Sequence, residues 1–221
     1  MMDQCLIRCT NLSFSYTPDR PVLSELNFTL FSAERVGIAG PNGAGKTTFL
    51  HLLVGLLTPT TGDIWAFGTD RKTEHDFYEV RVRAGLVFQD ADDQLFSPTV
   101  LEDVAFGPLN LGKSPQEARE VSLRTLHLLG LHGFEERITY KLSYGEKRLI
   151  ALATVLAMQP DVLLLDEPTN GLDPGAKQRL TDVLLHLPQA MVLISHDTEF
   201  LQTLTTRTVA FPSLPLDIIR A

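Results

Sequence analysis

The chain has 221 residues, of which 44% are hydrophobic and 21% are charged. This composition is that of a globular protein and excludes a disordered, collagen-like or coiled-coil chain. A formal net charge of -8, from 19 Lys and Arg against 27 Asp and Glu, gives no broad basic field, so we expect no nucleic-acid partner. Cys5 and Cys9 are the only cysteines, too few for a disulfide framework or a four-ligand metal set, and a reducing cytosol is the default.

The sequence predicts no segment that crosses a membrane. The first residues lack the basic and apolar regions of a secretory signal. The most apolar stretch, residues 149–158, is about half as long as the roughly 20 residues that a spanning helix needs. Docking on a membrane protein stays open.

Short apolar runs alternate with helical patterns, which favours an α/β fold with crossover connections. Residues 36–39 are predicted as a buried strand, followed by a glycine-rich turn and an apolar helix over 47–57. Two further buried strands, 162–165 and 191–194, also end in polar residues. Because ligands bind at the carboxyl ends of parallel strands, we expect these three strand ends to form one site.

Residues 93–144 lose the strand pattern and predict a helical insertion. Ser114, Pro115 and Glu117 supply an N-cap, a first-turn proline and a capping box. We expect the following helix to bury apolar side chains, namely Val121, Leu123, Leu126, Leu128 and Leu129. After Arg207 the short tail contains Pro212 and Pro215, which break any long element.

The turn after the first buried strand matches the pattern G-x-x-x-x-G-K-[ST] in its required strand, loop and helix context. Its glycines let backbone N–H groups surround a phosphate, and the helix N-terminus adds a favourable dipole. Lys46 would reach the β- and γ-phosphates, and the Thr47 hydroxyl would bind Mg²⁺. The predicted phosphate-binding residues are Gly40, Pro41, Asn42, Gly43, Ala44, Gly45, Lys46, Thr47 and Thr48.

Asp166 and Glu167 follow the second buried strand, and neighbouring residues at a strand end point in different directions. This predicts Asp166 as a magnesium ligand and Glu167 as the general base for an attacking water. Acidic residues at strand ends also serve as N-caps of the next helix, and alone the pair would fit that role equally well.

With these two motifs the chain resembles the ATP-binding cassette (ABC) ATPases over almost its whole length. Residues 142–146, Leu-Ser-Tyr-Gly-Glu, resemble the family's signature motif Leu-Ser-Gly-Gly-Gln, with Tyr144 and Glu146 as departures. The resemblance implies a P-loop NTPase (RecA-like) lobe over 1–93 and 146–221, with a helical subdomain over 94–145, in one ABC domain from residue 3 to 221. It also implies that a second cassette, identical or not, sandwiches ATP against Ser143, Tyr144, Gly145 and Glu146.

Four further positions match the family. Gln89 corresponds to the glutamine that contacts Mg²⁺ and water, and His196 to the switch histidine that helps orient water and base. Residues 171–173, with Asp173, match the loop that crosses to the opposing cassette. Tyr16 lies where the family places a ring against adenine, although an ordinary strand aromatic stays the alternative.

Residues 88–100 and 102–108 resemble the energy-coupling-factor importers, especially those for cobalt and nickel. This implies an ATPase bound to the cytoplasmic face of a membrane, with a transmembrane coupling protein and a separate substrate-capture component as partners. We read Asp90, Asp92 and Asp93 as a solvated loop rather than a metal site. Alternatives are a vitamin importer of the same type and a soluble ABC ATPase acting on DNA or ribosomes. A P-loop GTPase or kinase is a third, but no Asn-Lys-x-Asp motif occurs.

Overall fold

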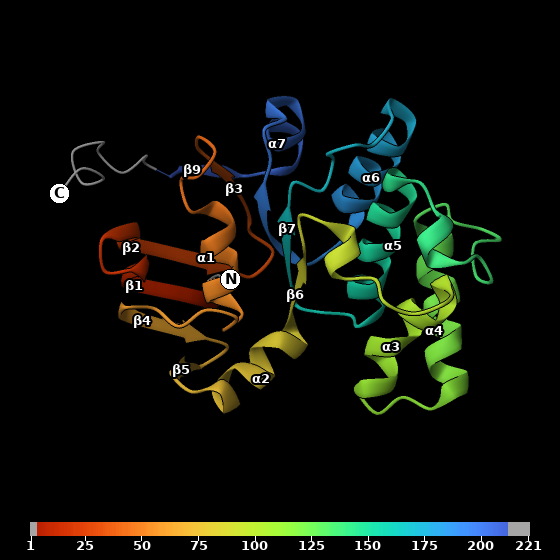
Figure 1. Ribbon diagram of the computed structural model, residues 1–221, viewed down its shortest axis with the longest axis horizontal. Helices are drawn as coiled ribbons and strands as arrows, with labels where there is room; N and C mark the ends of the chain where they lie inside the picture. The colour runs from red at the N-terminus through yellow and green to blue at the C-terminus, as the bar shows by residue number, and fades with distance from the viewer. Residues whose placement is uncertain (1–3, 212–221) are drawn as a thin grey trace.

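The computed structural model describes residues 4–211, which form two sheets with helices around them (Figure 1). A four-stranded sheet has the order β2-β1-β4-β5, and each neighbouring pair is antiparallel. A five-stranded sheet has the order β6-β7-β8-β3-β9, and each neighbouring pair is parallel. The strands are β1 Cys5–Thr17, β2 Arg20–Phe31, β3 Arg35–Ala39, β4 Thr61–Ala66, β5 Thr69–Arg71, β6 Ala84–Val87, β7 Val162–Asp166, β8 Ala190–Ile194 and β9 Arg207–Ala210.

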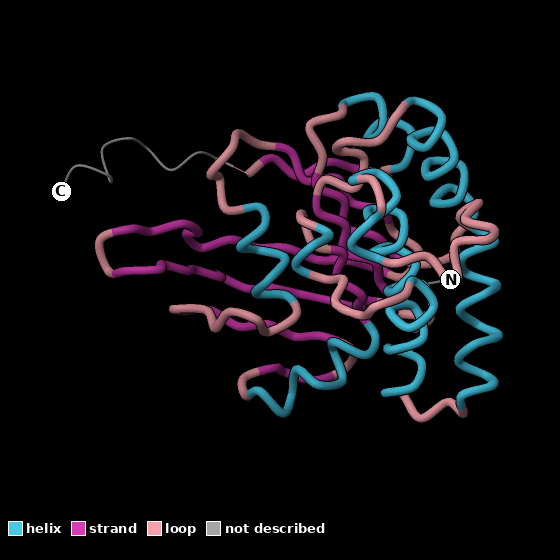
Figure 2. Tube along the Cα trace, turned by 45° about the vertical axis from the view of Figure 1, so that its right-hand side comes forward, coloured by secondary structure: helices cyan, strands magenta, loops and turns pink. Residues whose placement is uncertain are grey.

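The helices lie around both sheets and gather on the side away from the antiparallel sheet (Figure 2). They are α1 Lys46–Leu53, α2 Glu74–Arg83, α3 Val100–Asn110, α4 Pro115–Leu128, α5 Tyr144–Ala157, α6 Pro174–His186 and α7 Thr198–Leu204, with short 3₁₀ turns η1 Ala91–Asp93 and η2 Thr139–Lys141. Within residues 4–211 no helix combines the length and apolarity that crossing a bilayer requires. The predicted α/β fold is confirmed.

The parallel sheet separates two hydrophobic cores, because the side chains of a strand alternate between its faces. Val162 and Leu164 of β7 pack with α1 and the antiparallel sheet. Leu163 and Leu165 of the same strand pack with α5 and α6 on the other face. A strand buried on both faces reads as a continuous apolar run, which is why β7 and β8 were predictable from sequence.

The helix predicted over 47–57 is shorter than expected: α1 ends at Leu53. Gly55 has a φ of 71°, and a Cβ there would lie 2.2 Å from the Phe77 ring. The chain therefore turns at Gly55 so that α2 can pack closely against it.

The capping box that begins α4 is confirmed, since Ser114 accepts from the N–H of Glu117. The buried set was partly wrong. Leu128 is 53% exposed, and Leu123 is only half-buried, whereas Val121, Leu126 and Leu129 are buried. Buried positions 121, 122, 125, 126 and 129 follow a single helix face, and position 128 lies at the edge of that face, at the last residue of α4, where it is exposed. Pro212 and Pro215 lie outside the described residues.

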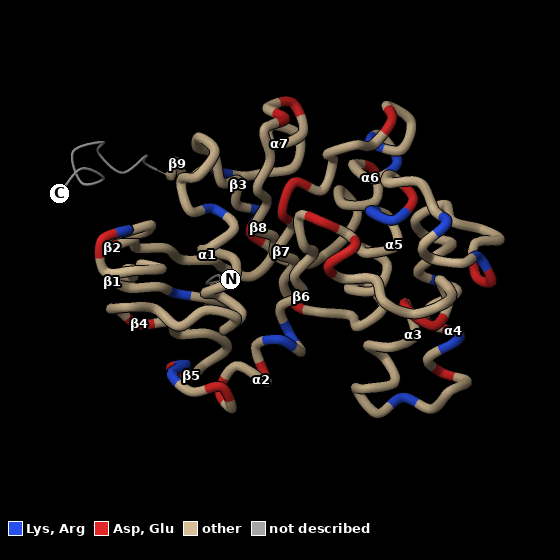
Figure 3. The backbone as a smooth tube through the Cα atoms, in the orientation of Figure 1, with Lys and Arg blue, Asp and Glu red and all other residues tan. Residues whose placement is uncertain are grey.

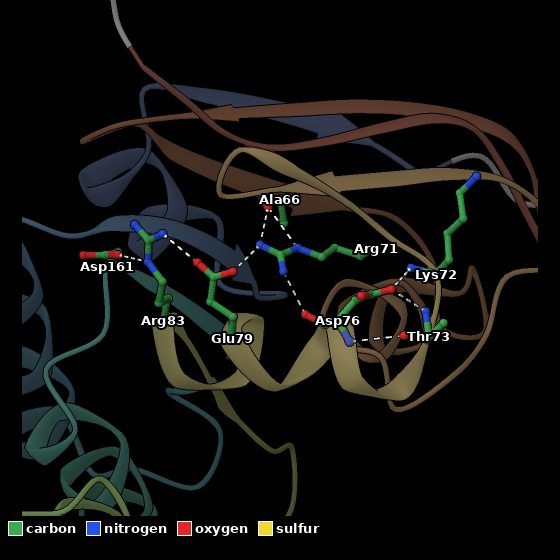
Figure 4. Close-up of polar contacts among 8 residues, drawn as sticks. All are labelled: Ala66, Arg71, Lys72, Thr73, Asp76, Glu79, Arg83 and Asp161. Atoms are coloured by element: carbon green, nitrogen blue, oxygen red, sulfur yellow. Dashed lines mark hydrogen bonds and ion pairs between the residues drawn. The ribbon is translucent and has the colours of Figure 1, made fainter.

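The antiparallel sheet was not predicted as a separate layer, and α2 connects it to the parallel sheet (Figure 4). The buried Arg71 donates to the Ala66 carbonyl from Nε and Nη2, at 3.0 and 2.8 Å, and from Nη2 to Glu79 at 2.7 Å. Glu79 in turn accepts from Arg83, whose Nε donates to Asp161, just before β7, at 2.6 Å. One hydrogen-bonded chain thus joins both sheets.

Two smaller features complete the fold. Asp76 closes the capping box of α2, where the N–H of Thr73 donates to its carboxylate at 2.8 Å; this bond, with that from Lys72, lowers the pKa of Asp76 to about 2. Cys5 and Cys9 are free thiols on β1, and burial raises the pKa of Cys9 to about 12, so Cys9 is a core residue.

Candidate active site

The carboxyl ends of β3, β6, β7 and β8 open into one cleft of about 1450 Å³, as the sequence predicted for three of these strands. It brings together most of the predicted site residues: Tyr16, Pro41, Asn42, Gly43, Ala44, Gly45, Lys46, Thr47, Thr48, Gln89, Asp166, Glu167 and His196. Gly40 is the first residue of the same loop, and its carbonyl accepts a hydrogen bond from Lys46. Figure 3 shows acidic segments around the end of β7 and the segment after β6, with Lys and Arg scattered elsewhere.

The loop between β3 and α1 has a shape that requires glycine. Gly43 and Gly45 have φ values of 79° and 86°. A Cβ on Gly45 would also lie 2.8 Å from Val22 Cγ1, so the loop lies directly on β2. Lys46 is buried, and its Nζ donates to the carbonyls of Gly40 and Pro41 at 2.8 and 2.9 Å. The N-terminus of α1 and one ammonium group therefore face the cleft, as anion binding requires.

Thr47 and Asp166 place two oxygens next to each other: the Thr47 hydroxyl donates to Asp166 Oδ2 at 2.6 Å. Burial raises the pKa of Asp166, against the opposing hydrogen bond from Thr47 and the charges of His51 and Lys46. The Thr47 hydroxyl and the Asp166 carboxylate are in contact, the Gln89 amide lines the same cleft, and oxygen donors of these kinds suit Mg²⁺; a cation here would offset the cost of burying the carboxylate.

Glu167 has a strained backbone and an unpaired oxygen. Its φ of 48° is uncommon for a residue with a side chain, and its N–H donates to the Ile194 carbonyl at 2.9 Å. Oε2 accepts from the N–H of His196 at 3.2 Å, while Oε1 is buried without a hydrogen-bond partner within residues 4–211. Glu167 lines the cleft, and a carboxylate with a free acceptor position can take a proton from a water molecule that reaches it.

His196 lines the cleft beside the phosphate loop. Its Nε2 is 2.9 Å from Asn42 Oδ1 and 3.5 Å from Glu167 Oε1. The ring is thus in contact with both the loop and the acidic strand end. This is a position from which it can sense a group bound between them.

The β1–β2 hairpin forms a cleft wall that sequence reasoning found only in part. The Tyr16 hydroxyl is 3.1 Å from Thr48 Oγ1, and the exposed ring meets Phe14 edge-on. Arg20 and Val22, together with Asn170 after β7, also line the cleft and were missed. These residues lie within a few positions of Tyr16 or Glu167 in the sequence, and this proximity could have indicated that they line the cleft.

The segment 143–146 does not line the cleft but begins α5, three residues before the predicted helix start at 147. The Ser143 hydroxyl and N–H both donate to Glu146 Oε2 at 2.8 Å. The N–H of Ser143 is the main cause that lowers the pKa of Glu146, and Arg137 contributes from 3.1 Å. Glu146 is thus a carboxylate that caps this helix.

Tyr144, the first residue of α5, contacts two other segments of its own chain. Its ring lies on Gly171, and its hydroxyl accepts from the buried Arg148 at 2.9 Å. Asp173, also outside the cleft, caps α6 by accepting from the N–H groups of Gly175 and Ala176 at 2.8 and 3.0 Å. The two segments predicted to face an opposing cassette therefore touch each other within one chain.

A phosphate loop opposite an acidic strand end, on a parallel sheet covered on both faces, defines the P-loop nucleoside triphosphatases. Within that class the chain belongs to the ABC transporter family, because the model of that family matches residues 23–170. It is an ATP-binding and ATP-hydrolysing cassette, with ATP and Mg²⁺ as its cofactors.

Relatives and solved structures support this assignment. A Brucella suis protein with the provisional name of an ABC transporter ATP-binding protein is 54% identical over 190 residues, 86% of this chain and 79% of that protein. The energy-coupling factor transporter ATP-binding protein EcfA of Methanothermobacter thermautotrophicus is 41% identical over 227 residues, 97% of this chain and 73% of that protein.

Two solved structures share the fold over nearly the whole chain. One is cbiO1 from Clostridium perfringens, part of the ABC transporter complex cbiONQ, with a TM-score of 0.83 and 30% identity over 94% of this chain and 85% of that one. The other is the dimeric ATP-binding cassette MJ0796 bound to ADP and Pi, with a TM-score of 0.86 and 25% identity over 93% of this chain and 94% of that one. The resemblance to energy-coupling-factor ATPases is thereby confirmed.

Proposed function

We propose that this chain is the ATPase of an energy-coupling-factor importer that drives cobalt or nickel uptake through a separate membrane coupling protein. The observation that carries the proposal is an exposed apolar surface beside the segment that follows Gln89. The choice of cobalt or nickel rests on the resemblance of residues 88–100 and 102–108 to importers of those ions, and the similarity to EcfA and cbiO1 supports the energy-coupling-factor class. A vitamin importer of the same type and a soluble ABC ATPase are the alternatives.

In the proposed hydrolysis, each group acts from its position in the cleft. Lys46 binds the β- and γ-phosphates with the loop N–H groups, and Tyr16 stacks on the adenine. Thr47, Asp166 and Gln89 would hold Mg²⁺, which supplies charge neutralisation on the phosphates when bound. Glu167 takes the proton of the attacking water at its carboxylate, whose Oε1 accepts no hydrogen bond within the described chain.

His196 and the signature segment complete the proposed site. His196 reports on the γ-phosphate through its contacts with Asn42 and Glu167. Ser143, Tyr144, Gly145 and Glu146, together with Asp173, face a second cassette across a head-to-tail interface. The open cleft exceeds the about 300–1,000 Å³ typical of ligand pockets, which fits a site whose remaining wall comes from a partner.

The proposed docking surface consists of Phe96, Phe106 and Leu109. These side chains are 67, 47 and 43% exposed, and the two phenylalanine rings meet edge-on with centroids 4.8 Å apart. The surface belongs to residues 94–145, which we propose as the helical subdomain of one cassette spanning 3–221. Adjacent exposed aromatic rings favour a partner that covers them, and a coupling protein on the cytoplasmic face of a membrane is that partner.

Two polar side chains connect this surface to the catalytic cleft. Gln94 accepts from the N–H of Phe88, next to Gln89, and donates to Ala151 and Thr154 of α5 at 2.7 Å. The buried Asp103 accepts from the N–H groups of Phe96 and Ser97 and from Thr139, which lies just before the signature segment. Movement of the docking surface can therefore reach both Gln89 and Ser143 through a few hydrogen bonds.

The deciding experiment substitutes the docking surface and measures transport. Phe106→Asp should abolish cobalt and nickel uptake in cells and release the membrane partner in a pull-down, while the purified variant still binds ATP. Leu128→Asp is the matched control, because Leu128 is a similarly exposed apolar residue on α4. If the Phe106→Asp variant takes up both ions normally but no longer takes up a vitamin, the result supports the vitamin importer. Normal transport of every solute with an intact ATPase supports the soluble alternative.

A further inference from the structure

The Tyr144 ring fills a notch that only glycine can provide. A Cβ at Gly171 would lie 2.4 Å from Tyr144 Cδ1 and 2.5 Å from Cε1, so the ring rests directly on the backbone. Gly171 also has a φ of 75°, which favours glycine. The loop at 171–173 is therefore held against the first turn of α5.

The hydroxyl of the same tyrosine is a partner for a buried cation. Arg148 is 3% exposed, and its Nη2 donates to the Tyr144 hydroxyl at 2.9 Å. Its Nη1 makes a weak 3.5 Å hydrogen bond to the carbonyl of Asp166, and its Nε has no partner within the described residues. Leaving a buried charge unpaired is costly, so the hydrogen bond between Arg148 and Tyr144 holds both side chains in place.

We propose that Tyr144 is a positioning residue that prepares the interface with the second cassette. The ring joins the exposed Ser143 and Asp173 into one rigid surface, and through Arg148 it joins that surface to the end of β7. A surface that is ordered before association loses less conformational entropy when the partner binds. This inference rests on the proposed function, because it requires a two-cassette sandwich.

The proposal predicts the opposite of what the motif alone suggests. Tyr144→Gly produces the usual Ser-Gly-Gly of the family, which would be expected to improve the interface. In this chain it removes the support of the 171–173 loop and a hydrogen-bond acceptor of Arg148. The substitution should therefore weaken the dimer.

The test uses the Glu167→Gln protein, which should retain ATP, and measures dimerisation by sedimentation with ATP and Mg²⁺. Tyr144→Gly should weaken dimerisation at least about tenfold, and Tyr144→Phe, which keeps the ring but loses the hydroxyl, should have a smaller effect. Tyr140→Ala is the control, because Tyr140 is 73% exposed and lies just before the motif. A Tyr144→Gly dimer as tight as its parent overturns the proposal. If that variant does not fold, a Tyr144→Phe protein indistinguishable from its parent overturns it.

A second measurement separates this inference from the proposed function. Amide hydrogen exchange of Leu172 and Asp173 in the nucleotide-free monomer should become at least about tenfold faster in Tyr144→Gly but not in Tyr140→Ala. Unchanged exchange overturns the positioning role even where dimers form. A Glu167→Gln parent that stays monomeric with ATP overturns the sandwich, and with it the role of Tyr144 there, although the exchange result still reports whether Tyr144 orders the loop.

Discussion

The Thr47 hydroxyl donates a 2.6 Å hydrogen bond to Asp166, a residue 119 positions away in the sequence. The pair joins the first turn of α1 to the end of β7. It also buries a carboxylate whose pKa is raised by that burial. Ionisation of a carboxyl group in this state costs stability, and a bound cation would offset that cost.

Asp166→Asn should therefore stabilise the nucleotide-free protein and abolish magnesium-dependent ATP hydrolysis. Because the folded-state pKa of Asp166 is raised, its ionisation disfavours folding at neutral pH, and this cost shrinks as the pH falls below that pKa and vanishes below the unfolded-state pKa. We expect the variant to melt at least about 2 °C higher at pH 7, with a difference that shrinks at acidic pH. Calorimetry at several pH values checks this, and an unchanged or lower melting temperature at pH 7 contradicts it.

Lys46→Ala should weaken ATP binding about tenfold to a hundredfold, since a hydrogen bond to a charged group contributes about 1.5 to 3 kcal/mol. The ammonium already lies over the loop through Gly40 and Pro41, so it needs little rearrangement to meet a phosphate. Calorimetric titration with ATP and Mg²⁺ measures the change. Unaltered affinity would remove Lys46 from the site.

Glu167→Gln should lower ATP turnover by about 10² to 10⁴ while ATP binding survives. The amide keeps an acceptor for the N–H of His196 but cannot take a proton from water. Steady-state hydrolysis and ATP titration of the same protein separate the two effects. Turnover near the native rate would falsify the role as base, and loss of binding as well would indicate misfolding or a metal role.

Arg137→Ala should weaken ATP-driven dimerisation about threefold to tenfold, because it leaves the Glu146 carboxylate uncompensated at the helix end that we propose faces the partner's phosphates. Adding Glu146→Gln should restore dimerisation, since no carboxylate then needs neutralising. The effect should shrink at high salt. Arg124→Ala, at an exposed arginine of α4, is the control. A double variant as weak as Arg137→Ala alone shows that Arg137 acts in another way.

Local signals explain which parts of the molecule the sequence could predict. The phosphate loop and strands β3, β7 and β8 are encoded in contiguous residues, through glycine spacing and runs buried on both faces. β1 was missed because bulges between Cys9 and Leu12 and near Phe14 break its alternation. The contact of Tyr144 with Gly171 joins residues far apart in the chain, so no local pattern reports it. Leu128 shows that an apolar residue at a helix end need not share the buried face.

The sharing of β7 and β8 between two cores also governs how the molecule comes apart. Neither the antiparallel layer nor the helical layer can detach without baring one face of these strands. Both layers should therefore lose structure in one cooperative transition, with the slowest amide exchange in the two central strands. Asp166 stands at the end of β7, and Glu167 follows it, so the groups proposed to hold metal and activate water are attached to the strands expected to open last. Helices α3 and α4 pack on α5 in the second of these cores, so they should lose structure together with the helical layer.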